Sequence, residues 1–197
     1  MKYARDSRPS VSNEQTAQLL FEALPWIKNL TGKTVVIKYG GSAMVDEQLR
    51  ADVMGDILLL KIIGVKLVLV HGGGAAINET LKHYDLPATF LDGQRVTTPE
   101  VMDIVREVLV GKVNQELVAA INEHGSVAVG VSGSDAGTII ADQLDPNLGR
   151  VGKITRINSD YLESLLDNEY IPVVATVAQG EDGGFYNVNA DVAAGHI

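Results

Sequence analysis

The 197-residue sequence contains no cysteine, so disulfide bonds and thiolate metal sites are excluded. Basic residues are also few: 16 lysines and arginines stand against 25 aspartates and glutamates, which gives a net charge of −9. This balance disfavours nucleic-acid binding, which needs a basic face. No apolar run has the length of a membrane-spanning helix, and the polar N-terminus lacks the apolar core of a signal peptide. We therefore expect a cytoplasmic protein that binds neither nucleic acid nor a membrane.

Several common catalytic signatures are missing as well. There is no P-loop motif G-x-x-x-x-G-K-[ST], and no complete G-x-G-x-x-G. The four histidines, His71, His83, His124 and His196, do not have the spacing of metal ligands, so no protein metal site is predicted. No Ser/His/Asp order indicates a hydrolase. His71 lies in a glycine turn and is interpreted as a structural residue rather than a base.

The sequence does contain a glycine turn directly after an apolar strand. Residues 35–37 are β-branched and predict a buried strand, which ends at Lys38. Gly40 and Gly41 follow, and glycines allow bare N–H groups to approach a ligand. The lysine adds a mobile positive charge beside them. This arrangement favours the binding of phosphate oxygens.

A second turn repeats the pattern. Residues 66–70 predict a strand, residues 72–74 are three glycines, and residues 75–84 predict a helix. A glycine turn that leads into a helix N-terminus is a ready anion site. Either glycine set alone could be only a tight connection between elements. Two of them at the ends of apolar strands favour a binding site.

The order of strands and helices predicts an α/β protein, a three-layer αβα sandwich with a mainly parallel sheet. Buried strands are expected at residues 34–38, 66–70, 126–131 and 171–176, and helices at residues 46–63, 75–84, 99–124, 159–167 and 192–197. Shorter strands are expected at residues 138–143, 150–157 and 185–188, the first two as an antiparallel pair. The long helix at residues 99–124 fits either the core or a subunit contact.

Four polar residues outside the glycine turns are further candidates for binding or catalysis. Arg95 follows an Asp92-Gly93 hairpin signal, and its guanidinium suits a carboxylate, although an arginine on a hairpin arm is most often solvated. Asn187 and Asn189 precede the last helix, where their amides can cap it or hold a ligand. Asp191 can orient a lysine, help to hold a metal or complement the helix dipole.

The N-terminal segment, residues 1–31, stands outside the alternation of strands and helices. Ser12 and Gln15 fit a capping box that opens an amphipathic helix, and Pro25 is expected to kink it. The helix can dock on its own sheet or pair with another subunit. We expect residues 32–197 to form one αβα domain.

Five segments together resemble the acetylglutamate kinases of the amino acid kinase family. IKYGGSAM, LVLVHGGGAAIN, LDGQRVTTPE, LVGKVN and FYNVNAD occur here in the same order, and the resemblance runs from Asn13 to about Ala194. It implies that Lys38 and Asp191 are catalytic, that Lys38, Gly40 and Gly41 bind phosphate, and that Gly73, Gly74, Arg95 and Asn187 bind the substrate.

The resemblance also implies a reaction and partners. The γ-phosphoryl group of ATP, with Mg²⁺, would pass to the side-chain carboxylate of N-acetyl-L-glutamate in arginine biosynthesis. The N-terminal helix implies a dimer or hexamer, with L-arginine as an inhibitor. The family's C-terminal nucleotide-binding domain has no counterpart in these 197 residues, so this chain alone is expected to be inactive. Glutamate 5-kinase, carbamate kinase and a non-catalytic oligomerisation or arginine-sensing module remain as alternatives.

Overall fold

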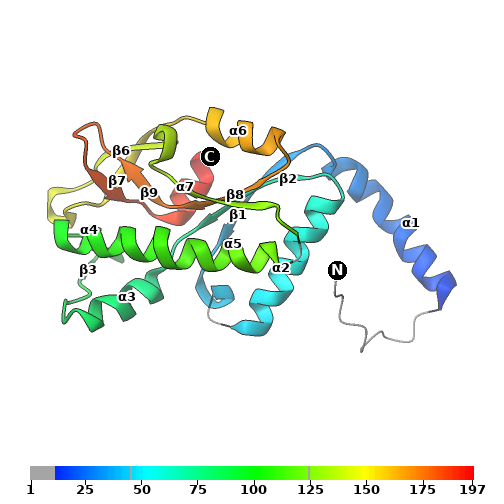
Figure 1. The fold of residues 1–197 in the computed structure, drawn as a ribbon, viewed down its shortest axis with the longest axis horizontal. Helices are drawn as coiled ribbons and strands as arrows, with labels where there is room; N and C mark the ends of the chain where they lie inside the picture. The colour runs from blue at the N-terminus through cyan, green and yellow to red at the C-terminus, as the bar shows by residue number, and fades with distance from the viewer. Residues whose placement is uncertain (1–11, 45, 124) are drawn as a thin grey trace.

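A parallel sheet of four strands forms the centre of the computed structural model, which describes residues 12–44, 46–123 and 125–197 (Figure 1). The sheet contains, in spatial order, β1 (Thr34–Tyr39), β2 (Lys66–His71), β8 (Ile171–Ala175) and β5 (Ala128–Ser132). In β2 alternate residues face opposite sides: Leu67 and Leu69 belong to one apolar cluster, Val68 and Val70 to the other. A strand buried on both faces needs a layer of helices on each side.

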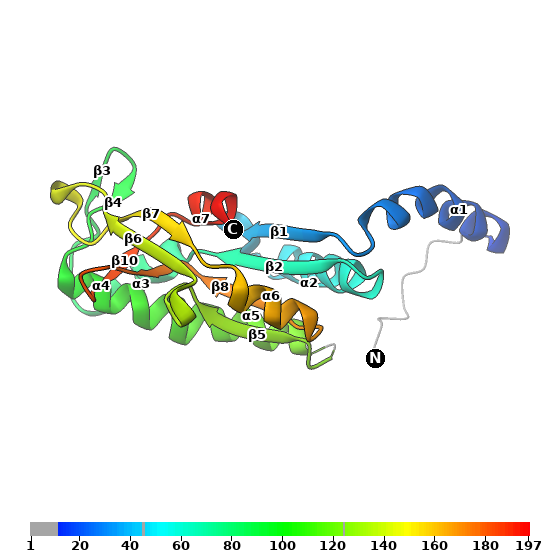
Figure 2. The same cartoon turned by 90° about the horizontal axis from the view of Figure 1, so that it is seen from above.

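Helices supply these two layers (Figure 2). On one face lie α2 (Glu47–Ile62), α3 (Gly74–His83), α4 (Pro99–Arg106), the π-helical segment η2 (Glu107–Val113) and α5 (Asn114–Asn122). On the other face lie α6 (Asp160–Asp167) and α7 (Ala190–His196). The predicted αβα sandwich with a parallel sheet is confirmed.

A second sheet extends the molecule at one end. It contains, in spatial order, β10 (Phe185–Asn187), β9 (Val177–Gln179), β6 (Ile139–Gln143) and β7 (Gly152–Ile157). The antiparallel pairing of β6 with β7 was predicted, whereas β9 was not, because residues 177–179 continue the apolar run of β8. Short 3₁₀ turns are η1 (Gly41–Met44), η3 (Asp135–Gly137) and η4 (Pro146–Leu148).

The predicted hairpin is present as β3 (Phe90–Leu91) and β4 (Gln94–Arg95). Asp92 and Gly93 both have positive φ, at 48° and 79°, as a two-residue hairpin turn of this kind requires. The turn residues therefore determine the position of Arg95 on the second arm.

Two local predictions need correction. The helix expected over residues 99–124 is interrupted by η2, whose sequence has no feature that marks a π segment. Ser159 precedes α6, but its hydroxyl does not cap the helix and instead donates to Glu163 Oε1 at 2.8 Å. By contrast, Thr98 caps α4 as expected, with its Oγ1 accepting from the Val101 N–H.

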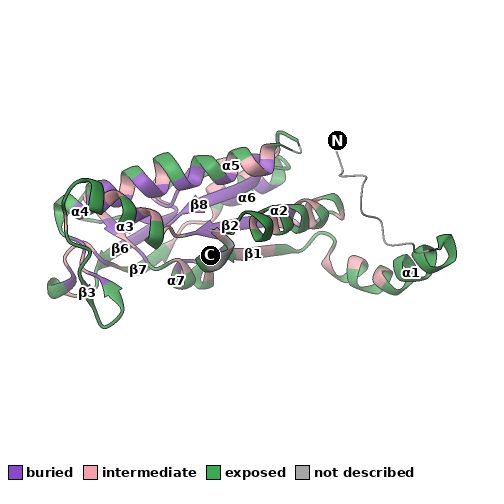
Figure 3. Cartoon of the chain, turned by 90° about the horizontal axis from the view of Figure 1, so that it is seen from below, coloured by how far each residue is buried: buried purple, intermediate pink, exposed green. Residues whose placement is uncertain are grey.

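The helix α1 (Asn13–Leu30) projects from the sandwich (Figure 1). Its predicted capping box is present, with Ser12 and Gln15 each accepting a backbone N–H of the other, and the helix continues through Pro25. None of its residues is buried, so it does not dock on the sheet (Figure 3). Among the described residues, no helix is both long and apolar enough to cross a membrane. Residues 1–11 and His124 lie outside the described residues.

Candidate active site

The parallel register of β1 and β2 places the two glycine turns side by side. Tyr39 pairs with His71, so both strands reach the same edge of the sheet together. Beyond that edge Gly41 has φ +66°, a conformation that favours glycine. A Cβ at Gly40 would lie 3.3 Å from Lys38 Nζ, so a side chain there would press on the lysine. The side chain of Lys38 therefore lies close against this turn.

Lys38 forms an ion pair with Asp191, the acid in the first turn of α7. The Nζ–Oδ1 distance is 3.1 Å, and the two side chains are 35% and 70% exposed. An ion pair with this much exposure adds little to stability. Its importance is positional, because it holds the ammonium group at the cavity described below. The dipole interpretation of Asp191 also fits, since the residue lies at a helix N-terminus.

The second glycine turn is packed tightly against the π segment. A Cβ at Gly73 would lie 2.7 Å from Leu109 Cδ2 and 3.2 Å from Val113 Cγ2, both on η2. Gly74 is the first residue of α3, and a Cβ there would meet nothing within 4 Å. The close approach of η2 therefore requires glycine at position 73 but not at position 74.

Arg95 is buried rather than solvated, which departs from the most common situation for an arginine on a hairpin arm. Its Nη2 donates to the Gly74 carbonyl at 3.2 Å and to Asn78 Oδ1, and the guanidinium carbon lies 4.8 Å from the centre of the Phe90 ring. Within the described chain, its buried Nη1 has no hydrogen-bond partner. Burial lowers the pKa of Arg95 from its usual value. A buried, unsatisfied guanidinium N–H is suited to an anionic oxygen.

The two asparagines before α7 have different roles. Asn189 caps the helix, with Oδ1 accepting from the N–H groups of Asp191 and Val192. The amide of Asn187 instead donates to Thr97 Oγ1 at 3.3 Å, and the residue lies on the same cavity as Arg95. The capping alternative thus applies to Asn189 and not to Asn187.

Two cavities meet at the second glycine turn. The larger, of about 550 Å³, is lined by Lys38, Gly40, Gly41 and Asp191 among others. The smaller, of about 220 Å³, is lined by Arg95 and Asn187 among others. Both are lined by residues 72–74, 189 and 190. The structure thus brings every predicted site residue onto one connected surface, with the phosphate-binding candidates on one side of the glycines and the carboxylate-binding candidates on the other.

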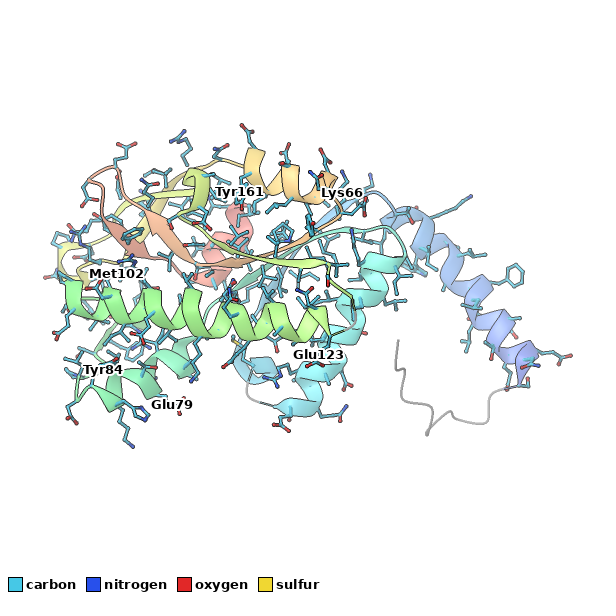
Figure 4. All side chains as sticks on the ribbon, in the orientation of Figure 1. Lys66, Glu79, Tyr84, Met102, Glu123 and Tyr161 are labelled. Carbon is cyan, nitrogen blue, oxygen red and sulfur yellow. The ribbon has the colours of Figure 1, made fainter. Side chains whose placement is uncertain are left out.

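Several residues of the site were not found from the sequence. Lys112 on η2 and Glu79 on α3 line the larger cavity, and Lys112 Nζ lies 3.7 Å from Glu79 Oε2. Figure 4 labels Glu79 on α3. Arg50 and Glu116 also line it. Lys112 lies in the LVGKVN segment, which was the available signal. The direction of the Lys112 side chain depends on the π-helical turn in which it lies, and the periodicity of the sequence does not indicate a π-helical turn.

His71 has the structural role expected for it. It is fully buried, Nδ1 lies 2.9 Å from the Gly72 carbonyl, and Nε2 lies 3.0 Å from Asn114 Nδ2. A carbonyl accepts and an amide nitrogen donates, so this arrangement assigns the proton to Nδ1 in a neutral ring. Burial lowers the pKa of His71 from its usual value.

The chain is similar to known proteins over most of its length. Over 183 residues, the chain is 51% identical to the acetylglutamate kinase of Caldanaerobacter subterraneus subsp. tengcongensis, which covers 92% of this chain and 61% of that protein. It is 48% identical to the acetylglutamate kinase of Corynebacterium glutamicum over 194 residues, 95% of this chain and 61% of that protein. The chain thus spans about three fifths of the length of these curated relatives.

A solved structure and a family profile complete the comparison. The crystal structure of smu.665 from Streptococcus mutans superposes with a TM-score of 0.77 at 32% identity, covering 83% of this chain and 66% of that one. The profile of the Amino acid kinase family matches residues 33–197, which include both glycine turns and both cavities. The chain belongs to the amino acid kinase family.

Proposed function

We propose that this chain is the acetylglutamate-binding part of an acetylglutamate kinase, which transfers the γ-phosphoryl group of ATP to the side-chain carboxylate of N-acetyl-L-glutamate. The observation that carries the proposal is the buried Arg95, whose unpartnered Nη1 lies across a glycine turn from the Lys38–Asp191 pair. The names of relatives at about half identity support the same activity. The site is thus suited to a substrate with one carboxylate to hold and another to phosphorylate.

The smaller cavity would hold the end of the substrate that does not react. Arg95 offers a guanidinium to the α-carboxylate, and Asn187 offers an amide beside it. The backbone of Gly73 and Gly74 separates this cavity from the larger one and would contact the substrate between its two ends. Carbamate has no α-carboxylate, so this arrangement disfavours carbamate kinase.

The larger cavity would hold the reacting groups. A side-chain carboxylate oxygen attacks the γ-phosphorus, the bond from that phosphorus to the β–γ bridging oxygen breaks, and ADP leaves with an acyl phosphate as the other product. Lys38 and the N–H groups at Gly40 and Gly41 would stabilise the charge on the transferring phosphoryl oxygens. Asp191 would keep Lys38 in position. The reaction needs no protein nucleophile.

The nucleotide enters this proposal as a substrate. The phosphates of ATP and its Mg²⁺ ion would lie at the Lys38 side of the larger cavity. In the described ranges no three His, Asp or Glu side chains cluster as a metal site, so we assign no protein ligand to the ion. We assign acetylglutamate binding to residues 32–197, and the adenine site to the length of the relatives that this chain does not cover. On this proposal the enzyme acts in the cytoplasm in arginine biosynthesis.

A comparison of acceptor substrates tests the proposal. The full-length protein is assayed for ADP release with Mg-ATP and either N-acetyl-L-glutamate, L-glutamate or carbamate. We expect turnover with the first acceptor alone. Phosphorylation of glutamate but not of its N-acetyl derivative would overturn the choice of substrate. Binding of acetylglutamate without turnover on any acceptor would favour the non-catalytic module instead.

A further inference from the structure

Thr97 lies between Arg95 and Asn187, two of the residues that line the smaller cavity, although Thr97 itself does not line it. Its side chain is completely buried. Its Oγ1 donates to the Arg95 carbonyl at 3.0 Å and accepts from Asn187 Nδ2 at 3.3 Å. A hydroxyl has a single proton, so this pair of bonds fixes its orientation. One hydroxyl therefore links the backbone that carries Arg95 to the side chain of Asn187.

The backbone around Thr97 is tied to the same two strands by a short strap, residues 148–150. The Thr97 N–H donates to the Leu148 carbonyl at 2.9 Å, and the Arg150 N–H donates to the Thr97 carbonyl at 2.6 Å. The Asn187 N–H in turn donates to the Arg150 carbonyl at 2.8 Å. Gly149 has φ +67°, and a Cβ there would lie 2.5 Å from the Thr97 carbonyl oxygen. Only glycine lets the strap approach this closely.

The side chain of Arg150 fixes the strap to the β9–β10 hairpin. Its Nη1 donates to Asp182 Oδ2 at 2.7 Å and to the Tyr186 hydroxyl at 3.3 Å. The Tyr186 hydroxyl donates to the same Asp182 oxygen, and Tyr186 is the neighbour of Asn187 on β10. The β4 arm, the strap and β10 are therefore joined into one unit behind the cavity.

We propose that Thr97 is a positioning residue that fixes the placement of Arg95 relative to Asn187, and thereby selects acceptors with an α-carboxylate. This inference rests on the proposed function. Arg95 comes from a short exposed hairpin, and Asn187 comes from the end of a three-residue strand. Neither element alone holds its functional group at a fixed distance from the other. The Gly74 carbonyl and Asn78 hold the Arg95 guanidinium itself. The Thr97 hydroxyl connects the Arg95 backbone to the Asn187 amide without lining the cavity, and it leaves Arg95 Nη1 and the remaining bonds of that amide for the ligand.

The test compares Thr97→Val, which keeps the shape but removes the hydroxyl, with Thr97→Ser, which keeps the hydroxyl. In the full-length protein, KM and kcat are measured for N-acetyl-L-glutamate, for ATP and for 4-acetamidobutyrate, the analogue without the α-carboxylate. We expect Thr97→Val to raise KM for acetylglutamate about tenfold, the order expected for one lost buried hydrogen bond. KM for ATP and kcat/KM for 4-acetamidobutyrate should change by less than about twofold. Thr97→Ser should resemble the wild type.

The possible outcomes distinguish a failure of the proposed carboxylate site from a failure of the proposed role of Thr97. A wild-type enzyme with no preference for acetylglutamate over 4-acetamidobutyrate would refute the carboxylate site itself. A wild-type preference that Thr97→Val leaves unchanged, or equal losses on both acceptors, would refute the positioning role. If Thr97→Val does not fold, Asp182→Ala is used instead, because it removes the acceptor that attaches Arg150 of the strap to the β9–β10 hairpin. A rise in KM confined to acetylglutamate supports the inference in that variant, and an unchanged KM overturns it.

Discussion

Arg95 shows how a single side chain can indicate the chemistry of a ligand. A guanidinium is costly to bury with an N–H unsatisfied, and Arg95, which lines the smaller cavity, keeps its buried Nη1 in that state within the described residues. In the proposed enzyme, the α-carboxylate of the substrate supplies the missing acceptor. The burial of Arg95 could not be deduced from the sequence, because an arginine on a two-residue hairpin arm looks the same whether it points to solvent or inward.

The first prediction concerns the affinity that this guanidinium provides. Arg95→Ala in the full-length enzyme should weaken acetylglutamate by about 1.5–3 kcal/mol, the loss expected for charge-assisted hydrogen bonds. ATP should be affected much less. Isothermal titration with each ligand measures both values. Arg156→Ala is the matched control, since Arg156 is exposed on β7 and lines neither cavity. Equal losses for the two substrates would show that Arg95 is only structural.

The second prediction follows from the lowered pKa of His71. The ordinary value is about 6.5, and the unfolded chain takes up a proton near that pH. The folded protein resists protonation there because the ring is buried. The free energy of unfolding should therefore be largest above about pH 6.5 and should fall as the pH decreases from there toward the folded-state pKa. Urea unfolding across this range measures the slope.

A pair of histidine substitutions identifies the titrating group. His71→Gln should reduce the slope of the unfolding free energy against pH, because the titrating group is then gone. His83→Gln on α3 serves for comparison, since His83 is exposed. An identical slope in wild type and His71→Gln would assign the pH dependence to other groups.

At the scale of elements, local sequence chemistry predicted most of what the structure contains. The Ser12–Gln15 capping box, the Thr98 cap and the Asp92-Gly93 turn depend only on neighbouring residues, and all three are present. The π segment η2 and the strand β9 depend on distant packing partners, and the sequence did not predict either. The direction of Lys112 was missed for the same reason.

The third prediction concerns the contact between η2 and the second glycine turn. Gly73→Ala should destabilise the protein by about 1–3 kcal/mol, because its Cβ would overlap Leu109 and force η2 to move. Gly74→Ala is the matched control, since the added Cβ meets nothing and alanine is the better helix former. Urea denaturation of both variants compares their stability. Equal stability of the two would mean that the turn accommodates a side chain without displacing η2.

At the scale of the whole molecule, sheet topology explains why the site residues meet. Tyr39 pairs with His71, and His71 pairs with Ala175, so the ends of β1, β2 and β8 lie at one edge. The first glycine turn, at Gly40 and Gly41, follows β1, and the second glycine turn follows β2. The β9–β10 hairpin, which carries Asn187, follows β8. The alternating strand and helix pattern predicted the parallel sheet, and the pairing seen in the structure brings these strand ends together. The division into two cavities was not predictable, because it depends on how side chains pack behind the turns.

The last prediction concerns assembly. The projecting helix α1 exposes large apolar side chains, which is unusual for a face without a partner: Leu19, Leu20, Phe21, Leu24 and Trp26 are 48–72% exposed. We propose that α1 pairs with the same helix of a second subunit. We propose a second, separate contact between two subunits through the continuous helical stretch of α4, η2 and α5. The inner face of this stretch packs in the core, so the contact would use its outer face. Two distinct two-fold contacts can close dimers into a hexameric ring.

Removal of α1 tests this assembly and the regulation proposed with it. A form of the protein that starts at Gly32 should contain fewer subunits per particle by light scattering than the intact protein. It should also lose inhibition by L-arginine, which we propose acts by favouring a wider ring. Phe21→Asp in the intact helix is a finer probe, because Phe21 is 71% exposed and its replacement removes apolar surface without shortening the chain. An unchanged number of subunits and unchanged arginine inhibition in both variants would show that α1 has no part in assembly.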